Sequence, residues 1–450
     1  MNNTACSIIK WCFAGLGLVG LVLYILALID PGISEALSTS VSAAVRNGLT
    51  VVSNLLPVSL LEILAGVVIV GVLAYAGFLV YKTIKQKEGV KIAGYWVQFA
   101  YVLFAIFGTG FLLFSLTYGV TTNRPKLYKT TQFQEQFYAP NLFKEQTMDS
   151  SLIYYVDRVN NAAADGIENE TIFYTATGHS RYASTGSSLS EISDAVNACF
   201  DLAAEDYPFL AGEHVEAKPL LLSAMYTKMG VGSIYSPITS EILINTDYPE
   251  IAVPLQVARA IAKQRGIADD ADAKFVAFLV CTEYADQLAA LGSEYNLDYI
   301  KYAAYMDAYM EVGNVAFYVS NNMHLYCTAA LKETAKKDMI AYVKHIDLLY
   351  DNINALEFIP ADEKTSTADY RDLPKLLYVD YNSRVNDGNI ILSFNTDDNP
   401  INAKASKYMY ARYLVSYFAT VEGDFMAEAE DLYAIYNPEP EANDGKGGAA

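Results

Sequence analysis

Histidine and cysteine are scarce in this chain, and their spacing lacks the usual signatures of metal and redox sites. The 450 residues include four histidines, none of them three or four positions from another. A spacing of three or four positions would place two imidazoles on one face of a helix, where they could bind a metal together. Because no pair of histidines has this spacing, we expect no metal site and no cofactor. The five cysteines form no C-x-x-C pair. We therefore expect buried free thiols rather than a disulfide among Cys199, Cys281 and Cys327.

Basic residues are also few over most of the chain. Residues 1–119 carry six lysines and arginines and four acids, whereas residues 120–450 carry a net charge of −22. An acidic domain of this kind repels the phosphates of nucleic acids, so we expect no nucleic acid partner. The last residues, 437–450, are rich in Pro, Glu and Gly and are predicted to form a disordered tail.

Three long apolar runs stand near the N-terminus, at about residues 11–29, 60–81 and 92–118. Roughly 20 apolar residues in a helix cross the hydrocarbon core of a bilayer. The sequence therefore predicts a membrane domain over residues 1–119 with three transmembrane helices and the lipid bilayer as its partner. A linker over 120–150 and one large domain over 151–436 are expected to follow.

The positive charges of the membrane part predict its orientation. The loop after the second run carries four lysines, Lys82, Lys85, Lys87 and Lys91, and short lysine-rich loops stay in the cytoplasm. The third helix then places the large domain outside the cytoplasm, as part of a multi-pass protein of the cell membrane. A basic cluster at Arg124, Lys126 and Lys129 weakens this signal. The stretch Ser38–Leu56 is amphipathic and is expected to lie along the membrane surface.

The large domain is predicted to be α+β, mostly helical around a small sheet. Short β-like runs cover Pro219–Ala224, Gly232–Tyr235 and Glu241–Asn245, and a helix is predicted from Pro254 to Gln264, ending at Gly266. Asp269 or Asp270 is expected to cap a second helix that runs to about Leu291. Further helices are predicted over residues 151–161, 187–204, 297–320, 328–356 and 403–421.

This order of strands, helix and acid-bearing helix is the layout of a zinc-peptidase core. The sequence resembles a bacterial domain-of-unknown-function family of three-helix, membrane-anchored proteins inferred to be zinc metallopeptidases. The stretches that carry the resemblance are Leu56–Glu62, Lys218–Ser223, Ile234–Asn245, Gln264–Ala268 and Asp272–Leu279. The resemblance implies a zincin-like extracytoplasmic domain after three transmembrane helices.

The family carries H-E-x-x-H, in which two histidines bind zinc and the glutamate activates the metal-bound water. Aligned to this motif, the first histidine position is Arg259, the glutamate position is Ala260 and the second histidine position is Lys263. The downstream acid of the ligand set falls at Asp272. Protonated Arg and Lys offer no lone pair, and alanine is no general base. The resemblance therefore implies a degenerate member without catalytic residues, in which the zinc of its relatives has lost its ligands.

We interpret Arg259 and Lys263 as replacing the charge of the metal and pairing with Asp272, or with Glu241 or Glu283; the alternative is an ordinary solvated helix face. The predicted binding cleft comprises Tyr235, Glu241, Asn245, Arg259, Lys263 and Asp272. The expected function is that of an inactive peptidase homologue that binds a peptide, a protein or an envelope component, with strand addition at Glu241–Asn245. Two alternatives remain open: an active metallopeptidase or hydrolase with a non-standard site, and a purely structural envelope protein.

Overall fold

The computed structural model describes residues 3–85, 89–129, 137, 139, 142–177, 180–184, 186–228, 231–339 and 409–428. They form two compact units. The first comprises Met1–Lys126 and Ser184–Ile300, and the second comprises Leu127–Ala183 and Lys301–Ala450. Packing thus groups the membrane part with residues 184–300, while the boundaries predicted at residues 119, 150 and 436 stay predictions. The predicted tail at 437–450 lies outside the described residues.

Three apolar helices begin the first unit: α1 (Asn3–Ile29), α4 (Leu60–Lys85) and α5 (Gly89–Thr117). Two segments, Leu60–Lys85 and Ile92–Thr121, are long and apolar enough to cross a membrane by length and composition, whereas the qualifying part of α1 is the shorter Gly15–Ile29. Two of the three predicted spans are therefore supported as membrane-crossing candidates. They support membrane association of the chain.

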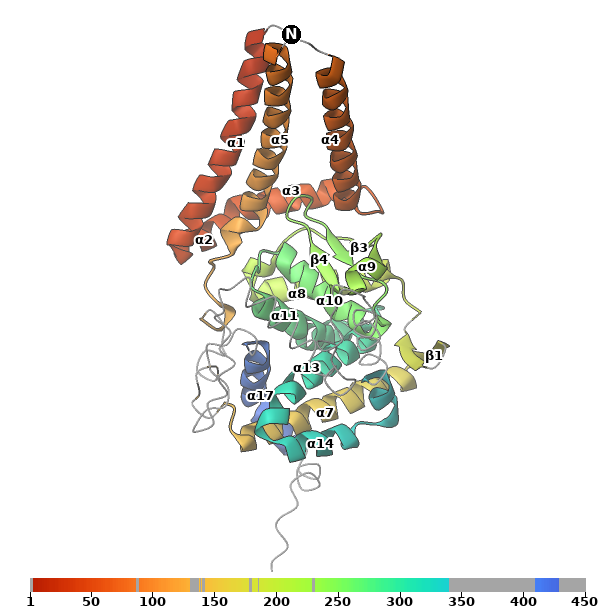
Figure 1. Ribbon diagram of the computed structural model, residues 1–450. Coiled ribbons are helices and arrows are strands. Elements are labelled where there is room, and N and C mark those ends of the chain that lie inside the picture. The colour runs from red at the N-terminus through yellow and green to blue at the C-terminus, as the bar shows by residue number, and fades with distance from the viewer. Residues whose placement is uncertain are drawn as a thin grey trace, which may run out of the picture. The chain divides into compact units, whose positions relative to one another are not determined.

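Helices α1 and α5 pack closely side by side (Figure 1), and α4 contacts α5 through Tyr75 and Phe99, whose ring centroids lie 5.5 Å apart. A Cβ at Gly17 would lie 3.1 Å from the Cα of Gly108, and one at Gly20 would lie 2.9 Å from the Cα of Leu112. Only glycine permits two backbones to approach this closely, as small residues do at helix contacts within membranes. Larger residues at these two positions would force α1 and α5 apart.

The segment between α1 and α4 forms α2 (Pro31–Leu37), the π-helical η1 (Ser38–Ser42) and α3 (Ala43–Ser53). Figure 1 shows α3 lying crosswise at the ends of α4 and α5. The buried side chains from α2 to α3 are polar, and five of them recur at every fourth position: Ser34, Ser38, Ser42, Arg46 and Thr50. The exposed large side chains are apolar, Val41, Val51 and Val52. This inverted amphipathic pattern fits a segment with protein on its polar side and lipid on its apolar side.

A small sheet lies in the same unit, next to α8 (Leu189–Asp206). Its strand order is β3-β5-β4, with β3 (Ala217–Pro219) parallel and β4 (Ser233–Tyr235) antiparallel to the central β5 (Ile242–Ile244). Leu243 of β5 pairs with Lys218 on one side and with Ile234 on the other. All three residues of β5 are buried, as expected for a central strand.

The predicted strand Pro219–Ala224 is mostly wrong. Strand β3 ends at Pro219, and α9 (Ser223–Lys228) follows after a turn. The backbone N–H of Leu221 donates to the Glu62 carboxylate at 3.0 Å, and this contact with α4 holds the turn. The local sequence contains no trace of a partner so distant in the chain. The strands predicted at Gly232–Tyr235 and Glu241–Asn245 are confirmed.

Two helices follow the sheet, as predicted. Helix α10 (Val253–Gln264) ends before Gly266, whose φ of +96° is the left-handed conformation that glycine adopts readily. Asp269 caps α11 (Asp270–Leu279), accepting from the N–H groups of Ala271 and Asp272 at 3.1 Å each. The helix continues through η6 (Val280–Tyr284) and α12 (Ala285–Ala290). Cys199 and Cys281 are free and buried in this unit, as expected.

The second unit is built from α7 (Glu145–Glu168), most of α13 (Leu297–Val319), α14 (Asn321–Ala330) and α17 (Met409–Glu428). A hairpin of β1 (Phe173–Thr177) and β2 (Ser180–Ser184) follows α7. The core of the second unit is rich in aromatic side chains. The Tyr155 hydroxyl donates to the Leu414 carbonyl at 2.8 Å, and Tyr154 packs against Phe418 and Phe425.

Two helix predictions in the second unit meet the structure only in part. The helix predicted over residues 328–356 is confirmed only in part: α14 ends at Ala330, residues 333–339 are helical, and residues 340–356 lie outside the described residues. Helix α17 overlaps the helix predicted over residues 403–421 and extends past its end. Cys327 is free and buried here.

Candidate functional site

Two cations lie one turn apart on α10. The helix is amphipathic: Val257, Ile261 and Gln264 are fully buried, whereas the side chains of Arg259 and Lys263 keep 25% and 23% of their surface exposed. Residues four positions apart share a helix face. Arg259 and Lys263 therefore point to one place at the margin of the core.

A single carboxylate oxygen meets both cations. Lys263 Nζ lies 2.7 Å and Arg259 Nε 3.0 Å from Asp270 Oδ1, and Arg259 Nη2 also contacts that oxygen. Asp270 is the first residue of α11, so the cluster joins the two helices. Arg259 and Lys263 therefore share one carboxylate, that of Asp270, which stands two positions before the predicted partner Asp272.

The cluster carries a surplus of positive charge. Although burial opposes its ionised form, Arg259, Lys263 and Lys274 hold the pKa of the Asp270 carboxyl well below its usual range. Burial, together with Arg259, lowers the pKa of Lys263. One carboxylate therefore faces two bonded cations, within a chain whose net charge is −20. A surplus of this kind attracts an anionic group.

The other aligned positions contain no acid–base machinery on the exposed face. Ala260 is 1% exposed and packs in the core. Asp272 is buried on α11, with its backbone N–H donating to the Asp269 cap. Glu283, the other acid considered, lies beside acids: burial, Asp206 and Asp286 raise its pKa. Of the predicted cleft residues, Arg259 and Lys263 are brought together by one shared partner, Asp270.

Glu241 has a different role from the one predicted. Its carboxylate is fully buried and binds Lys218 Nζ at 2.6 Å and the Thr239 hydroxyl at 2.7 Å. It also accepts from the backbone N–H groups of Leu60 and Leu61, both at 2.9 Å. These two groups open α4, so Glu241 caps the membrane-candidate helix and neutralises a buried lysine. It is no cleft residue.

Tyr235 and Asn245 also serve the fold. The Tyr235 ring packs against Tyr118 at the end of α5, and burial raises the pKa of its phenol to about 12. The Asn245 side chain donates to the Thr227 hydroxyl and the Val231 carbonyl, both at 2.9 Å, and so fixes the loop before β4. Neither residue belongs to the cluster on α10.

The end of α10 and the loop after it are held by α3 and by the residues that follow α5. The sequence analysis did not predict these contacts. Four residues, from the last of α10 to Ala268, bond to partners far away in the chain. These bonds are Gln264 to Thr50 (3.0 Å), the Arg265 carbonyl to Arg46 (3.3 Å), the Gly266 carbonyl to Arg124 (2.9 Å) and the Ala268 carbonyl to Tyr118 (3.3 Å). The basic residues Arg124 and Lys126, which weaken the orientation signal in the sequence, are ion-paired to Glu35 and Asp269.

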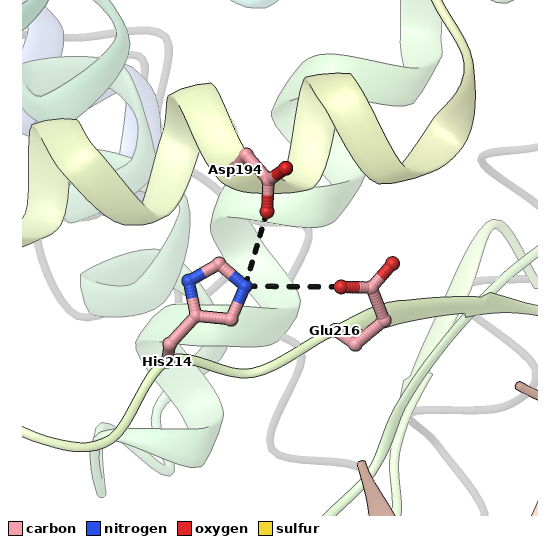
Figure 2. Close-up of side chains that lie close together, drawn as sticks. All are labelled: Asp194, His214 and Glu216. Carbon is pink, nitrogen blue, oxygen red and sulfur yellow. Dashed lines mark ion pairs between the residues drawn. The ribbon is translucent and has the colours of Figure 1, made fainter. Parts of the chain in front are cut away.

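A second cluster of chemical interest also escaped sequence reasoning. Asp194 of α8 lies beside His214 and Glu216, which precede β3 (Figure 2). The three could hold a metal ion by their ligand types and proximity. No spacing rule finds them, because a helix and an irregular segment contribute the ligands.

The fold and the sites define a mostly helical α+β protein with apolar helices suited to a membrane. The chain belongs to a family described as "Protein of unknown function (DUF3810)", whose model matches residues 38–358. That range includes α3, α4, α5, the sheet and the cluster on α10. No curated protein and no solved structure matches the chain.

Proposed function

We propose that this chain is a membrane-anchored binding protein, a member of its family without zinc-peptidase activity, that holds an extended acidic segment of a peptide or protein. Three helices anchor it, and the large domain lies outside the cytoplasm. The observation that carries the proposal is the Arg259–Asp270–Lys263 cluster. Where the family motif requires metal ligands, two cations share one carboxylate and join α10 to α11 as a metal would.

The cluster leaves no place for zinc on this face of α10. Arg and Lys carry positive charge and no lone pair, so they repel a divalent cation rather than bind it. Ala260 supplies no general base. The same two cations, with Lys274 nearby, attract a carboxylate or another anionic group. The change from ligands to cations therefore reverses the charge of what this position binds.

The second half of the proposed site is a strand edge, to which the bound segment adds as a further strand. This edge belongs to β4 and not to the predicted Glu241–Asn245. Strand β5 is central and has no open side, so an extended segment cannot add to Glu241–Asn245. Strand β4 lies at the edge of the sheet. It also packs beside α10, where the Ser233 hydroxyl bonds to the Gln256 side chain at 2.9 Å, one turn before Arg259.

The register shows which groups of β4 point outward. Asn245 N–H donates to the Gly232 carbonyl, and Ser236 N–H donates to the Glu241 carbonyl, so residues 232, 234 and 236 face β5. In an antiparallel pair the alternate residues turn their backbone groups away. The N–H and C=O of Ser233 and Tyr235 therefore form the outer edge, and we propose that they pair with the bound segment.

Metal analysis of the purified full chain tests the loss of the zinc site. We compare it with a variant that restores the family ligands, Arg259→His, Ala260→Glu, Lys263→His and Asp272→Glu. The restored variant should gain about one zinc per chain over the unmodified protein. If it gains none, the alignment of α10 with the motif is wrong. Peptide hydrolysis by the unmodified chain would favour the alternative of an active hydrolase.

Binding is tested with extended peptides of equal length that are acidic, neutral or basic. The acidic peptides should bind best to the unmodified chain, and Arg259→Glu with Lys263→Glu should abolish that preference. The matched control exchanges the cations, Arg259→Lys with Lys263→Arg, and should keep it. Equal binding of acidic and basic peptides would contradict the proposal and favour a purely structural role.

A further inference from the structure

A histidine and two carboxylates converge at the start of β3, away from the cluster on α10. His214 Nε2 lies 3.2 Å from Asp194 Oδ1 and 3.7 Å from Glu216 Oε2. Figure 2 shows the two carboxylates directed at the same nitrogen from different sides. One ligand atom from each residue lies within 4.8 Å of the others. His214 is exposed and the two acids are half-buried, so the group is open to solvent.

These distances match the spacing of ligands around one ion. Bonds of about 2.0–2.2 Å in tetrahedral geometry place neighbouring ligand atoms roughly 3.3 Å apart. The separation between His214 and Asp194 is already at that value, and a small rotation of the Glu216 side chain brings its oxygen as close. A pair of carboxylates also balances the charge of a divalent cation. Three protein ligands leave a fourth position for water or another ligand.

The backbone that carries two of the ligands is fixed on both sides. On the inner side, Val215 is fully buried, its N–H donates to Asn197 and its carbonyl accepts from Ser193 and Asn197. On the outer side, Asn54 donates to the His214 carbonyl at 2.8 Å and accepts from the Glu216 N–H at 3.2 Å. Alternation along this extended segment sends His214 and Glu216 outward together.

A neighbouring hydroxyl orients one of the carboxylates. The Ser190 hydroxyl donates to Glu216 Oε1 at 2.5 Å, which turns Oε2 toward His214. Ser190 and Asp194 lie one turn apart on α8. Partners of this kind, which hold the ligands rather than the ion, are the second half of a metal site. The ligands are therefore supported before any ion binds.

We propose that Asp194, His214 and Glu216 bind one divalent transition-metal ion of the zinc class. One imidazole with two carboxylates favours zinc over calcium and magnesium, which prefer oxygen ligands alone. The ion connects α8 to the segment entering β3, and Asn54 extends that connection to the end of α3. This site is independent of the former peptidase position on α10.

Zinc titration of the full chain in detergent, after removal of metal with a chelator, tests the proposal by calorimetry and metal analysis. We expect about one zinc per chain, with binding lost in His214→Ala and Asp194→Asn. Asn54→Ala should weaken binding by about tenfold, as loss of a supporting partner does.

The control is Glu205→Gln, at an exposed acid further along α8, which should bind zinc like the unmodified chain. Zinc binding that survives His214→Ala, or the absence of saturable binding, would overturn the proposal. Neither result bears on the role of α10, because that role is judged by the zinc gained when its own four positions are restored. The two proposals therefore fail separately.

Discussion

The buried pair of Lys218 and Glu241 gives the sharpest stability prediction. Both side chains are 1% exposed or less, and Glu241 receives four donors: Lys218 Nζ, the Thr239 hydroxyl and the N–H groups that open α4. The substitution Glu241→Gln keeps the size of the side chain but removes its charge. It also turns an NH₂ group toward groups that donate to the carboxylate, and it leaves Lys218 without its counterion.

Removing one partner of a buried ion pair costs about 3–5 kcal/mol. For a unit of roughly this size, 1 kcal/mol corresponds to about 2–4 °C in melting temperature. We therefore expect Glu241→Gln to melt roughly 10 °C lower than the unmodified protein. The N–H groups of Leu60 and Leu61 should also exchange hydrogen faster, because their cap is weakened.

The assay is thermal unfolding of the full chain in detergent, with hydrogen exchange at the start of α4. Glu205→Gln, at an exposed carboxylate of the same unit, is the matched control and should melt like the unmodified protein. Lys218→Met combined with Glu241→Gln should be more stable than the sum of the single losses, because no buried charge is left alone. A shift below about 2 °C for Glu241→Gln, or strict additivity, would refute the reasoning.

Three further predictions concern the candidate site and its supports. Ser233→Pro removes an outward N–H and should abolish binding of extended peptides with little change in melting temperature. Ile234→Pro removes an inward N–H and should unfold the sheet. Equal effects of the two substitutions in the binding and melting assays would contradict the register of β4. Gly266→Ala should lower the free energy of unfolding by about 1–3 kcal/mol, because φ is +96° and a Cβ would meet the Arg46 guanidinium. Gly292 also has a positive φ but faces open space, so Gly292→Ala should lower the free energy of unfolding by less in the same thermal assay. Neighbouring cations depress the pKa of Asp270, so its stabilising contribution is present above the unfolded pKa of about 3.9 and is lost only as the pH falls through the lower folded value. The melting difference between the unmodified chain and Asp270→Asn should thus stay constant from pH 7 to pH 5, and a difference that vanishes by pH 5 would contradict this pairing.

Local sequence signals predicted the elements that depend on near neighbours. The capping carboxylate of Asp269, the glycine at position 266 and the apolar period of Val253–Gln264 are all written within a few residues. The cations at 259 and 263 were likewise placed on one face by their spacing alone. The choice of Asp270 over Asp272 was beyond that reasoning, because the angle between two helices decides which residue of the first turn reaches the neighbouring helix.

The sequence by itself determined the apolar helices, the α+β character, the acidic charge and the absence of metal ligands on α10. Tertiary structure alone decided the roles of the polar residues. Glu241 became a helix cap for α4, β5 became a central strand, and His214 met Asp194 across a helix and an irregular segment. The physical reason is that apolar periodicity and caps are local properties of the chain, whereas the partner of a buried charge is set by which distant segments pack against it.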